Sequence, residues 1–320
     1  MVEAINLALR EEMERDDRVV ILGEDVGREG GVFRVTDGLQ ATFGPDRVID
    51  TPLAESGIVG VALGMAVYGL HPIAEIQFEG FLYPCLDQIN NHIGRIRNRS
   101  RGRFTAPMVI RTPYGGGIHA PEHHSDSPEA LFAHLPGIKV VIPSTPHEAK
   151  GLLLSSIRDP DPVIFFEPKR IYRAIREEVP EGDHAIPLGK ARLVQEGKDV
   201  TVIAWGAMVR EVVAAAEQLK GDKIELEIID LRTISPMDVE AVVQSIRKTG
   251  RGVIVHEAPK TCGFGAEIVA LINEKALLSL QAPVERVTGF DVPFPLMKSE
   301  DYYLPNPKRI VTAVKKVMSF

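Results

Sequence analysis

An alternation of short β-branched runs with longer helical patterns constrains the fold of this chain most, and it occurs twice along the sequence. In the first half, strands are predicted at residues 19–22, 47–50, 72–76, 108–111, 139–142 and 163–166. Helices are predicted between several of these strands, at residues 55–68, 82–98 and 147–157. Such alternation is typical of a parallel sheet covered by helices on both faces.

Residues 168–188 interrupt this pattern with prolines, a glycine and mixed charges. The alternation then restarts, with strands predicted at 200–204, 224–231, 252–256 and 284–288 and helices at 209–219, from Pro236, at 264–272 and at 308–317. We therefore predict two α/β domains with mostly parallel sheets, at residues 1–175 and 189–320, joined by a linker at 176–188.

Charge and hydropathy exclude two classes of function. The formal net charge of −7 is spread over intermixed acidic and basic residues, which argues against a nucleic-acid-binding protein. Apolar stretches such as 58–70 contain glycines and are shorter than the roughly 20 residues of a spanning helix, so no membrane partner is expected. The N-terminus lacks a basic region followed by an apolar core, and two distant cysteines, Cys85 and Cys262, are both expected to be buried. These features indicate a cytoplasmic protein.

A histidine-rich stretch is the first candidate site. It runs from Gly115-Gly-Gly-Ile-His119 to His123-His124-Ser-Asp-Ser127, just after a predicted strand, where parallel sheets form their ligand crevices. Glycines allow close approach of the backbone, and histidines exchange protons near neutral pH. Catalytic or substrate-binding histidines are therefore predicted, and two alternatives remain: a structural loop, or a metal site. The metal site would use the side chains of His119, Glu122, His123 and His124.

Glu55 is the second candidate. It follows a predicted strand and begins a helix that is apolar nearly all round, so the helix is expected to be buried. A carboxylate at this position is favoured by the helix dipole alone, which is the structural interpretation. Desolvation of the same carboxylate would raise its pKa, as in many catalytic acids, which is the functional interpretation.

Several longer motifs occur together in one order along nearly the whole chain: Leu22-Gly-Glu-Asp-Val-Gly27, Asp50-Thr-Pro-Leu-Ala-Glu-Ser-Gly57, Glu75-Ile-Gln-Phe78, His124-Ser-Asp-Ser127, Lys150-Gly-Leu-Leu153, Ile229-Asp-Leu-Arg-Thr233 and His256-Glu-Ala-Pro259. Together they resemble the beta subunit of the decarboxylating component of pyruvate and branched-chain 2-oxo acid dehydrogenases. The resemblance implies an N-terminal thiamine-diphosphate (pyrimidine) domain and a C-terminal transketolase-like domain.

The resemblance also implies an assembly. Relatives form heterotetramers of two alpha and two beta subunits, and thiamine diphosphate lies between an alpha and a beta chain. The alpha chain holds the diphosphate through magnesium with a Gly-Asp-Gly motif, whereas the Gly-Asp pairs here continue with His184 and Lys223. A dihydrolipoyl acyltransferase is the further partner. Relatives also hold a structural potassium ion, mainly through backbone carbonyls, at positions that match Ala106, Met108, Ser156, Asp159 and Asp161.

Residue roles follow from the same resemblance. Glu55 matches the glutamate that hydrogen-bonds the pyrimidine N1′ atom and so promotes deprotonation of the thiazolium carbon. His124 matches a histidine expected to assist proton transfer when the acyl group moves to lipoamide. Phe81 stands where relatives pack an aromatic ring on the pyrimidine, and Gln77 is a neighbouring candidate. Ordinary packing is the alternative for Phe81 and Gln77.

The predicted function is therefore oxidative decarboxylation of a 2-oxo acid with acyl transfer to lipoamide, active only with an alpha subunit. Pyruvate and branched-chain 2-oxo acids are both candidate substrates, and the segments 166–169 and 288–294 resemble the branched-chain relatives slightly more. Two alternatives stay open: a self-contained transketolase-like transferase that uses the same cofactor, and a non-catalytic α/β binding subunit.

Overall fold

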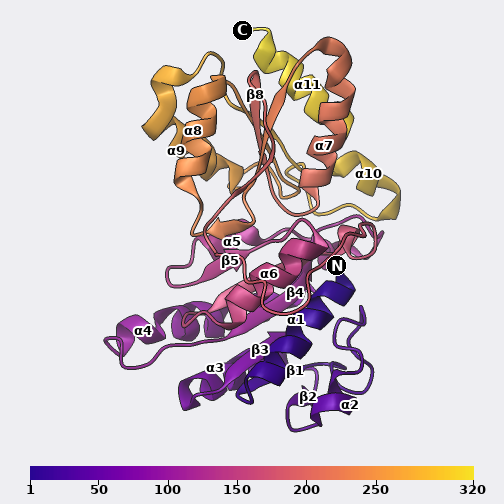
Figure 1. Ribbon diagram of the computed structural model, residues 1–320, viewed down its shortest axis with the longest axis vertical. Helices are drawn as coiled ribbons and strands as arrows, with labels where there is room; N and C mark the ends of the chain where they lie inside the picture. The colour runs from indigo at the N-terminus through magenta and orange to yellow at the C-terminus, as the bar shows by residue number, and fades with distance from the viewer. The chain divides into compact units, whose positions relative to one another are not determined.

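The computed structural model describes residues 1–320, which form two compact units (Figure 1). The first unit contains residues 1–114 and 131–188, and the second contains residues 115–130 and 189–320. Residues 115–130 therefore belong to the second unit although the sequence of the first surrounds them. The predicted fold class, α/β with mostly parallel sheets flanked by helices, is confirmed, whereas the linker at 176–188 stays a prediction.

The sheet of the first unit has the strand order β5-β6-β4-β3-β1-β2, and all of these strands run parallel. Its strands are β1 (Val19–Gly23), β2 (Val48–Asp50), β3 (His71–Glu75), β4 (Val109–Tyr114), β5 (Lys139–Val141) and β6 (Val163–Pro168). Residues of β1, β4 and β6 are buried throughout, as expected of parallel strands covered on both faces. The parallel register brings the carboxyl ends of β1, β2 and β3 to one edge, where Gly23 faces both Asp50 and Glu75.

The helices of the first half of the chain are α1 (Val2–Arg15), α2 (Leu39–Phe43), α3 (Glu55–Tyr68), α4 (Ile96–Arg99), α5 (Glu129–Ala133) and α6 (Pro146–Ile157). α6 begins where Thr145 accepts a hydrogen bond from the Glu148 amide, with Pro146 in the first turn. Its apolar side chains are buried, and α1 packs along it (Figure 1). No helix of the structure is at once long enough and apolar enough to cross a bilayer.

Helix α3 has the predicted bounds, but the prediction that it is buried all round is wrong. Its buried residues are Ile58, Val59, Ala62 and Ala66, which form one face. On the other side, Val61 is 54% exposed and Tyr68 is 92% exposed. The helix covers the sheet with a single face, and its remaining apolar surface has no covering within this chain.

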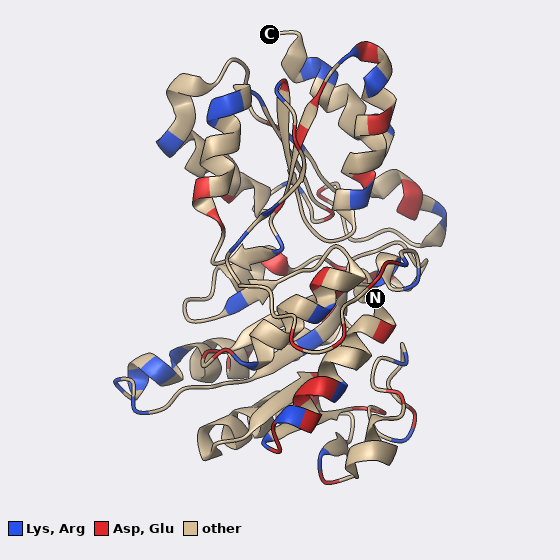
Figure 2. Cartoon of the chain, in the orientation of Figure 1, with Lys and Arg blue, Asp and Glu red and all other residues tan.

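The predicted regular helix at 82–98 is also wrong. This segment consists of a 3₁₀-helix (Glu79–Cys85), a π-helical turn (Gln88–His92), a second 3₁₀-helix (Ile93–Arg95) and the short α4. Pro84 has no amide hydrogen to donate, which disfavours a continuous α-helix through this point. Basic residues are concentrated at the α4 end of the segment (Figure 2), where Arg97 donates to Asp161 at 2.6 Å.

The second unit is built on a sheet with the order β12-β11-β8-β9-β7, in which only β7 is antiparallel to its neighbour. The strands of this sheet are β7 (Arg192–Gln195), β8 (Val200–Ala204), β9 (Leu226–Asp230), β11 (Gly252–Val255) and β12 (Glu285–Val287). Residues 189–320 also contain the short strand β10 (Thr233–Ser235), which is not part of this sheet. The helices of this unit are α7 (Met208–Leu219), α8 (Val239–Thr249), α9 (Gly265–Ala276), α10 (Glu300–Tyr303) and α11 (Pro307–Met318).

Two predictions fail in this unit. Pro236 was expected to begin a helix, but α8 begins at Val239, because Asp238 caps it by accepting from the Ala241 amide at 3.2 Å. Cys262 was expected to be buried, but it is exposed in the loop between β11 and α9, whereas Cys85 is buried as predicted.

Candidate active site

The carboxyl ends of β1 and β2 carry the first group of candidate residues. Glu24 directly follows β1, and Glu55 is the first residue of α3, five residues after the end of β2. Asp50 ties the two loops together, because its carboxylate accepts from the backbone amides of Gly27 at 2.6 Å and Arg28 at 3.1 Å. The start of α3 is held by Ser56, whose hydroxyl donates to the Pro84 carbonyl at 2.5 Å.

Glu24 is a site residue that the sequence analysis did not single out. It is buried, and its Oε1 atom has no hydrogen-bond partner within the chain. Burial raises the pKa of Glu24, and the nearby negative charges of Glu55 and Asp25 raise it further. A signal was present in the sequence, because Glu24 belongs to the Leu22-Gly-Glu-Asp motif directly after a buried strand.

Glu55 itself is partly exposed in this chain, so the fully dry setting expected from the sequence is not present here. The negative charge of Glu55 nevertheless raises the pKa of buried neighbouring groups. Burial, with a further contribution from Glu55, raises the pKa of the Cys85 thiol to about 12. Glu24 and Cys85 therefore lie near the Glu55 carboxylate in positions where burial disfavours their own negative charge, as in many catalytic sites.

Gln77 and Phe81 lie on the segment that leaves β3. The Gln77 amide donates to the Asp25 carboxylate at 3.2 Å, which places Gln77 beside the loop of Glu24. The ring of Phe81 contacts that of Phe78 edge to face, with centroids 6.2 Å apart, and Phe78 in turn contacts Phe33. The structure thus brings Glu55, Gln77 and Phe81 into the same unit, on segments that contact one another.

A buried polar network stiffens the same sheet. Arg111, on β4, donates to Glu75 and to Glu167, each at 2.7 Å, and all three side chains are at least 90% buried. The Tyr172 hydroxyl donates to the second oxygen of Glu167 at 2.6 Å. Burial raises the pKa of Glu167, while the guanidinium of Arg111 opposes that change. Nearby, Lys169 pairs with Glu79 at 3.0 Å, with both side chains fully buried.

The histidine-rich stretch lies in the second unit. We call residues 115–126 the histidine loop. Its ends meet where the Gly115 amide donates to the Asp126 carbonyl at 3.0 Å, and its far side is a short 3₁₀ turn from Glu122 to His124. His124 is half-buried, and its ring centroid lies 4.1 Å from that of exposed His123.

The metal-site alternative finds no support in the structure. The structure contains no group of three histidine, cysteine or acidic side chains that could hold a metal ion. His119, Glu122, His123 and His124 therefore do not form such a group. The residues matched to a potassium site lie around the amino ends of β4 and β6 and the end of α6. Among them, the Asp159 carboxylate is already paired with Lys139 at 2.5 Å.

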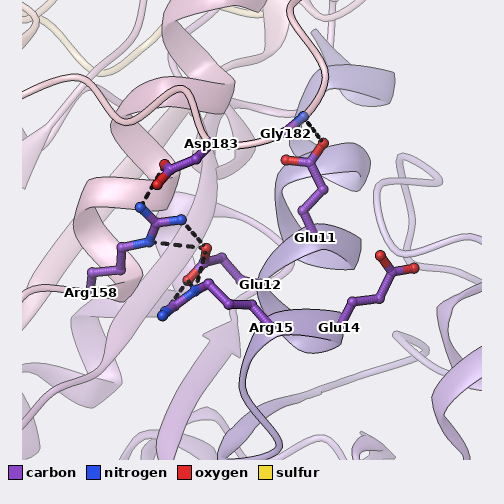
Figure 3. A pocket seen from close by; sticks show the side chains of 7 residues that line it. All are labelled: Glu11, Glu12, Glu14, Arg15, Arg158, Gly182 and Asp183. Atoms are coloured by element: carbon purple, nitrogen blue, oxygen red, sulfur yellow. Dashed lines mark hydrogen bonds and ion pairs between the residues drawn. The ribbon is translucent and has the colours of Figure 1, made fainter.

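A separate pocket of about 320 Å³ lies between α1, α6 and the segment at 182–183 (Figure 3). Arg158 spans it by donating to Glu12 at 2.5 Å and to Asp183 at 2.7 Å, while Glu11 accepts from the Gly182 amide at 2.9 Å. Glu12 is also paired with Arg15 at 2.6 Å. Most of these charges are paired with one another and join α1 and the end of α6 to the segment at 182–183, whereas the buried Glu11 Oε2 atom has no hydrogen-bond partner.

Comparisons with known proteins agree with this architecture. The family model of the transketolase pyrimidine-binding domain matches residues 1–174, and that of the transketolase C-terminal domain matches residues 189–310. A solved structure described as a split gene transketolase, an inactive beta4 tetramer, superimposes with a TM-score of 0.82 at 25% sequence identity, covering 99% of this chain and 97% of that one.

Curated relatives are more similar still, and they extend over the whole chain. The pyruvate dehydrogenase E1 component subunit beta of Acholeplasma laidlawii is 55% identical over 317 residues, covering 99% of this chain and 97% of the relative. The protein of the same name from Bacillus subtilis (strain 168) is 52% identical over 320 residues, covering 100% of this chain and 98% of the relative. This chain therefore belongs to the family of beta subunits of the pyruvate dehydrogenase E1 component.

Proposed function

We propose that this chain is the beta subunit of a thiamine-diphosphate-dependent 2-oxo acid dehydrogenase and works only with an alpha subunit. The observation that carries the proposal is the cluster of Glu55 and Glu24 at the carboxyl edge of the first sheet, in the part of the chain matched by the pyrimidine-binding domain model. The full-length relatives named as E1 beta subunits support the same function.

The residues of this edge fit an aminopyrimidine. Such a ring offers a nitrogen acceptor and an amino donor. Glu55 would hold the acceptor nitrogen, and the buried Glu24 Oε1 atom, which lacks a partner in the chain, suits a donor N–H group. The Phe81 ring would pack on the pyrimidine, and Gln77 would border it. Bound thiamine diphosphate would supply a nucleophilic carbon and an electron sink for decarboxylation.

The diphosphate, magnesium and potassium would be held outside the cluster of Glu24 and Glu55. The Gly-Asp-Gly motif is missing from this chain, so an alpha subunit would hold the diphosphate and magnesium. A structural potassium ion would use backbone carbonyls around Met108 and Ser156, and the Asp159 side chain would stay with Lys139.

His124 would act in the second half of the reaction, transfer of the acyl group to lipoamide. In that step the two electrons left by decarboxylation would break the lipoyl S–S bond, one sulfur would take the acyl group as the bond to its carrier carbon breaks, and the other sulfur needs a proton to become a thiol. A half-buried imidazole on the histidine loop suits this proton transfer near neutral pH.

The exposed apolar face of α3 supports assembly with a partner. Val61 and Tyr68 lie on this face, and α3 begins at Glu55, so a subunit that covers the helix would also dry the carboxylate. We propose the alpha subunit as that partner, in a heterotetramer of two alpha and two beta chains that delivers acyl groups to a dihydrolipoyl acyltransferase.

Titration with thiamine diphosphate and magnesium tests the proposal. Tight binding and decarboxylation are expected only when the chain is mixed with an alpha partner, and comparison of pyruvate with branched-chain 2-oxo acids defines the substrate. Activity of the chain alone would instead support a self-contained transferase, and no cofactor binding in either sample would support a non-catalytic subunit.

Glu55→Gln tests the role of the carboxyl within the assembly. The variant should assemble normally but lose most exchange of the cofactor's C2 proton with solvent, which NMR measures directly. Glu29→Gln, at an exposed position in the loop after β1, is the matched control and should exchange normally. An unchanged exchange rate in the Glu55 variant would remove Glu55 from the mechanism.

A further inference from the structure

We propose that Glu257 and Glu300 are positioning residues, which hold the histidine loop in the shape that acyl transfer requires. This inference rests on the proposed function and adds two carboxylates that act through His124. Both side chains are almost completely buried and belong to the second unit, as the loop does. They lie 141 and 183 residues along the chain from the loop amides that they bind.

Glu257 holds the first glycine turn of the loop. It lies two residues after the end of β11, and its Oε2 atom accepts a hydrogen bond from the Gly116 amide at 2.9 Å. Gly115 has a φ of +76°, and a Cβ atom there would lie 2.7 Å from the same carboxylate oxygen. Only glycine allows this approach, so the turn and the carboxylate are matched to each other.

Glu300 makes two contacts with the next part of the loop. One oxygen accepts from the Gly117 amide, and the other lies 3.2 Å from Nδ1 of His119. The side chain of Glu300 is fully buried, whereas that of His119 is half-exposed. Hydrogen bonds from backbone amides to a carboxylate are charge-assisted and therefore stronger than neutral ones.

An apolar cluster of Phe294, Tyr303 and Leu304 backs the same turn. A Cβ atom at Gly116 would lie 2.5 Å from the Phe294 ring and 3.3 Å from the Leu304 side chain. Because α10 supplies both Glu300 and Tyr303, the polar and apolar supports of the turn come from one short segment.

The anchored turn reaches His124 through the backbone of the loop. The Gly115 amide is bonded to the Asp126 carbonyl, and the His124 amide donates to Pro121 at 2.9 Å. The loop is thus a closed ring, held at its glycine end and carrying the imidazole two residues before the Asp126 carbonyl that closes it. Release of either carboxylate would let that imidazole shift, and misplacement of a reacting group by about 1 Å costs on the order of 100-fold in rate.

Glu300→Ala in the reconstituted assembly tests the inference. Acyl transfer to lipoamide should fall roughly 10- to 100-fold, mainly in kcat. The reduction of ferricyanide that depends on the 2-oxo acid reports decarboxylation without lipoamide, and it should stay near that of the unaltered assembly. Hydrogen–deuterium exchange should accelerate at residues 115–126 and not elsewhere in the second unit. Glu300→Gln keeps an acceptor for Gly117 and should restore part of the exchange protection.

Glu227→Ala is the matched control, because Glu227 is also a buried carboxylate of the second unit beside a glycine amide, that of Gly197 at 3.4 Å. It should leave the ratio of the two activities unchanged. Equal loss of both activities in Glu300→Ala, or unchanged acyl transfer, would overturn the inference. Failure of the proposed function looks different, because the unaltered assembly would then show no thiamine-dependent activity at all.

Discussion

The buried carboxylates that support the two candidate sites, one site in each unit, are held differently. In the first, Glu75 and Glu167 share the Arg111 guanidinium, and Glu79 is paired with Lys169. In the second, Glu257 and Glu300 accept from backbone amides of the histidine loop, and the His119 ring beside Glu300 is half-exposed. The Arg111 network joins strands of a sheet, whereas Glu257 and Glu300 join the histidine loop to the segment after β11 and to α10.

Pairing with a cation and binding by backbone amides suit different structural roles. Pairs of full charges in a dry interior are very costly to separate, so the Arg111 network holds the carboxyl edge of the first sheet in one geometry. An amide is neutral, so its bond to a carboxylate is weaker and easier to break and remake. We infer that the Arg111 network makes its sheet stiff, while the loop of His124 is held firmly enough to be positioned and loosely enough to move.

Arg111→Met should produce the largest effect. It leaves Glu75 and Glu167 buried without their cation, so the free energy of unfolding should fall by about 3–5 kcal/mol. Urea unfolding measures this change. Arg97→Met, which removes a half-exposed partner of Asp161, is the control and should cost far less. Similar losses in the two variants would contradict the idea of a stiff, charge-paired frame.

The stability of the second unit is expected to depend on pH, because this unit buries a neutral histidine. His256 is fully buried and stacks on Trp205, with ring centroids 5.4 Å apart. Burial, helped by Arg286, lowers the pKa of His256 to about 3. Since the unfolded pKa is near 6.5, the folded state binds fewer protons, and stability is lost as the pH falls from about 6.5 to 3.

His256→Phe should therefore remove a slope of up to about 1.4 kcal/mol per pH unit within that range. Unfolding free energies of the two proteins, measured from pH 7 to 4, give the slope by difference. Parallel curves would show that His256 does not titrate in this way.

Glu257→Gln should have a smaller effect on stability. The amide oxygen of glutamine can still accept from Gly116, so only the charge assistance is lost, at about 1 kcal/mol. Thermal unfolding measures the loss, and hydrogen exchange at residues 115–117 locates it. A loss as large as that of Arg111→Met would mean that the two kinds of carboxylate are equivalent.

Lys198→Ala should have the smallest effect. Lys198 pairs with Glu225 at 3.0 Å, but both side chains are more than half exposed, so solvent screens the pair. The midpoint of thermal unfolding should stay unchanged. A clear decrease would show that surface pairs also contribute to the difference between the units.

The sequence predicted the layered fold well, because periodicity reports directly on burial. The bounds of α3 and β8 were predicted correctly, and most other strands were found within a few residues. The failures have local causes. Helix propensity at 82–98 was overridden around Pro84, and Pro236 precedes a helix that is set by the cap at Asp238.

The sequence pointed to candidate site residues where they stand in a motif, and it missed residues that are far apart along the chain but close together in the structure. Glu55, His124 and Glu24 all stand in recognisable motifs, but Glu24 became a candidate only when the structure showed its buried oxygen atom without a partner. Glu257 and Glu300 could not be connected with the glycine turn before the structure placed them beside it. The exposed face of α3 was missed because an apolar sequence looks the same whether its own chain or a partner covers it.

Residues 115–130 have a consequence for how such chains can be divided or recombined. They are encoded inside the first unit but obtain their support from residues near the C-terminus. Division of the chain near residue 180 would leave an N-terminal fragment that carries the histidine loop without Glu257 and Glu300, which hold it. If relatives exchanged their C-terminal halves, the incoming half would need carboxylates that fit the glycine turn of the histidine loop. The histidine loop and the segments that carry Glu257 and Glu300 are therefore expected to be inherited together.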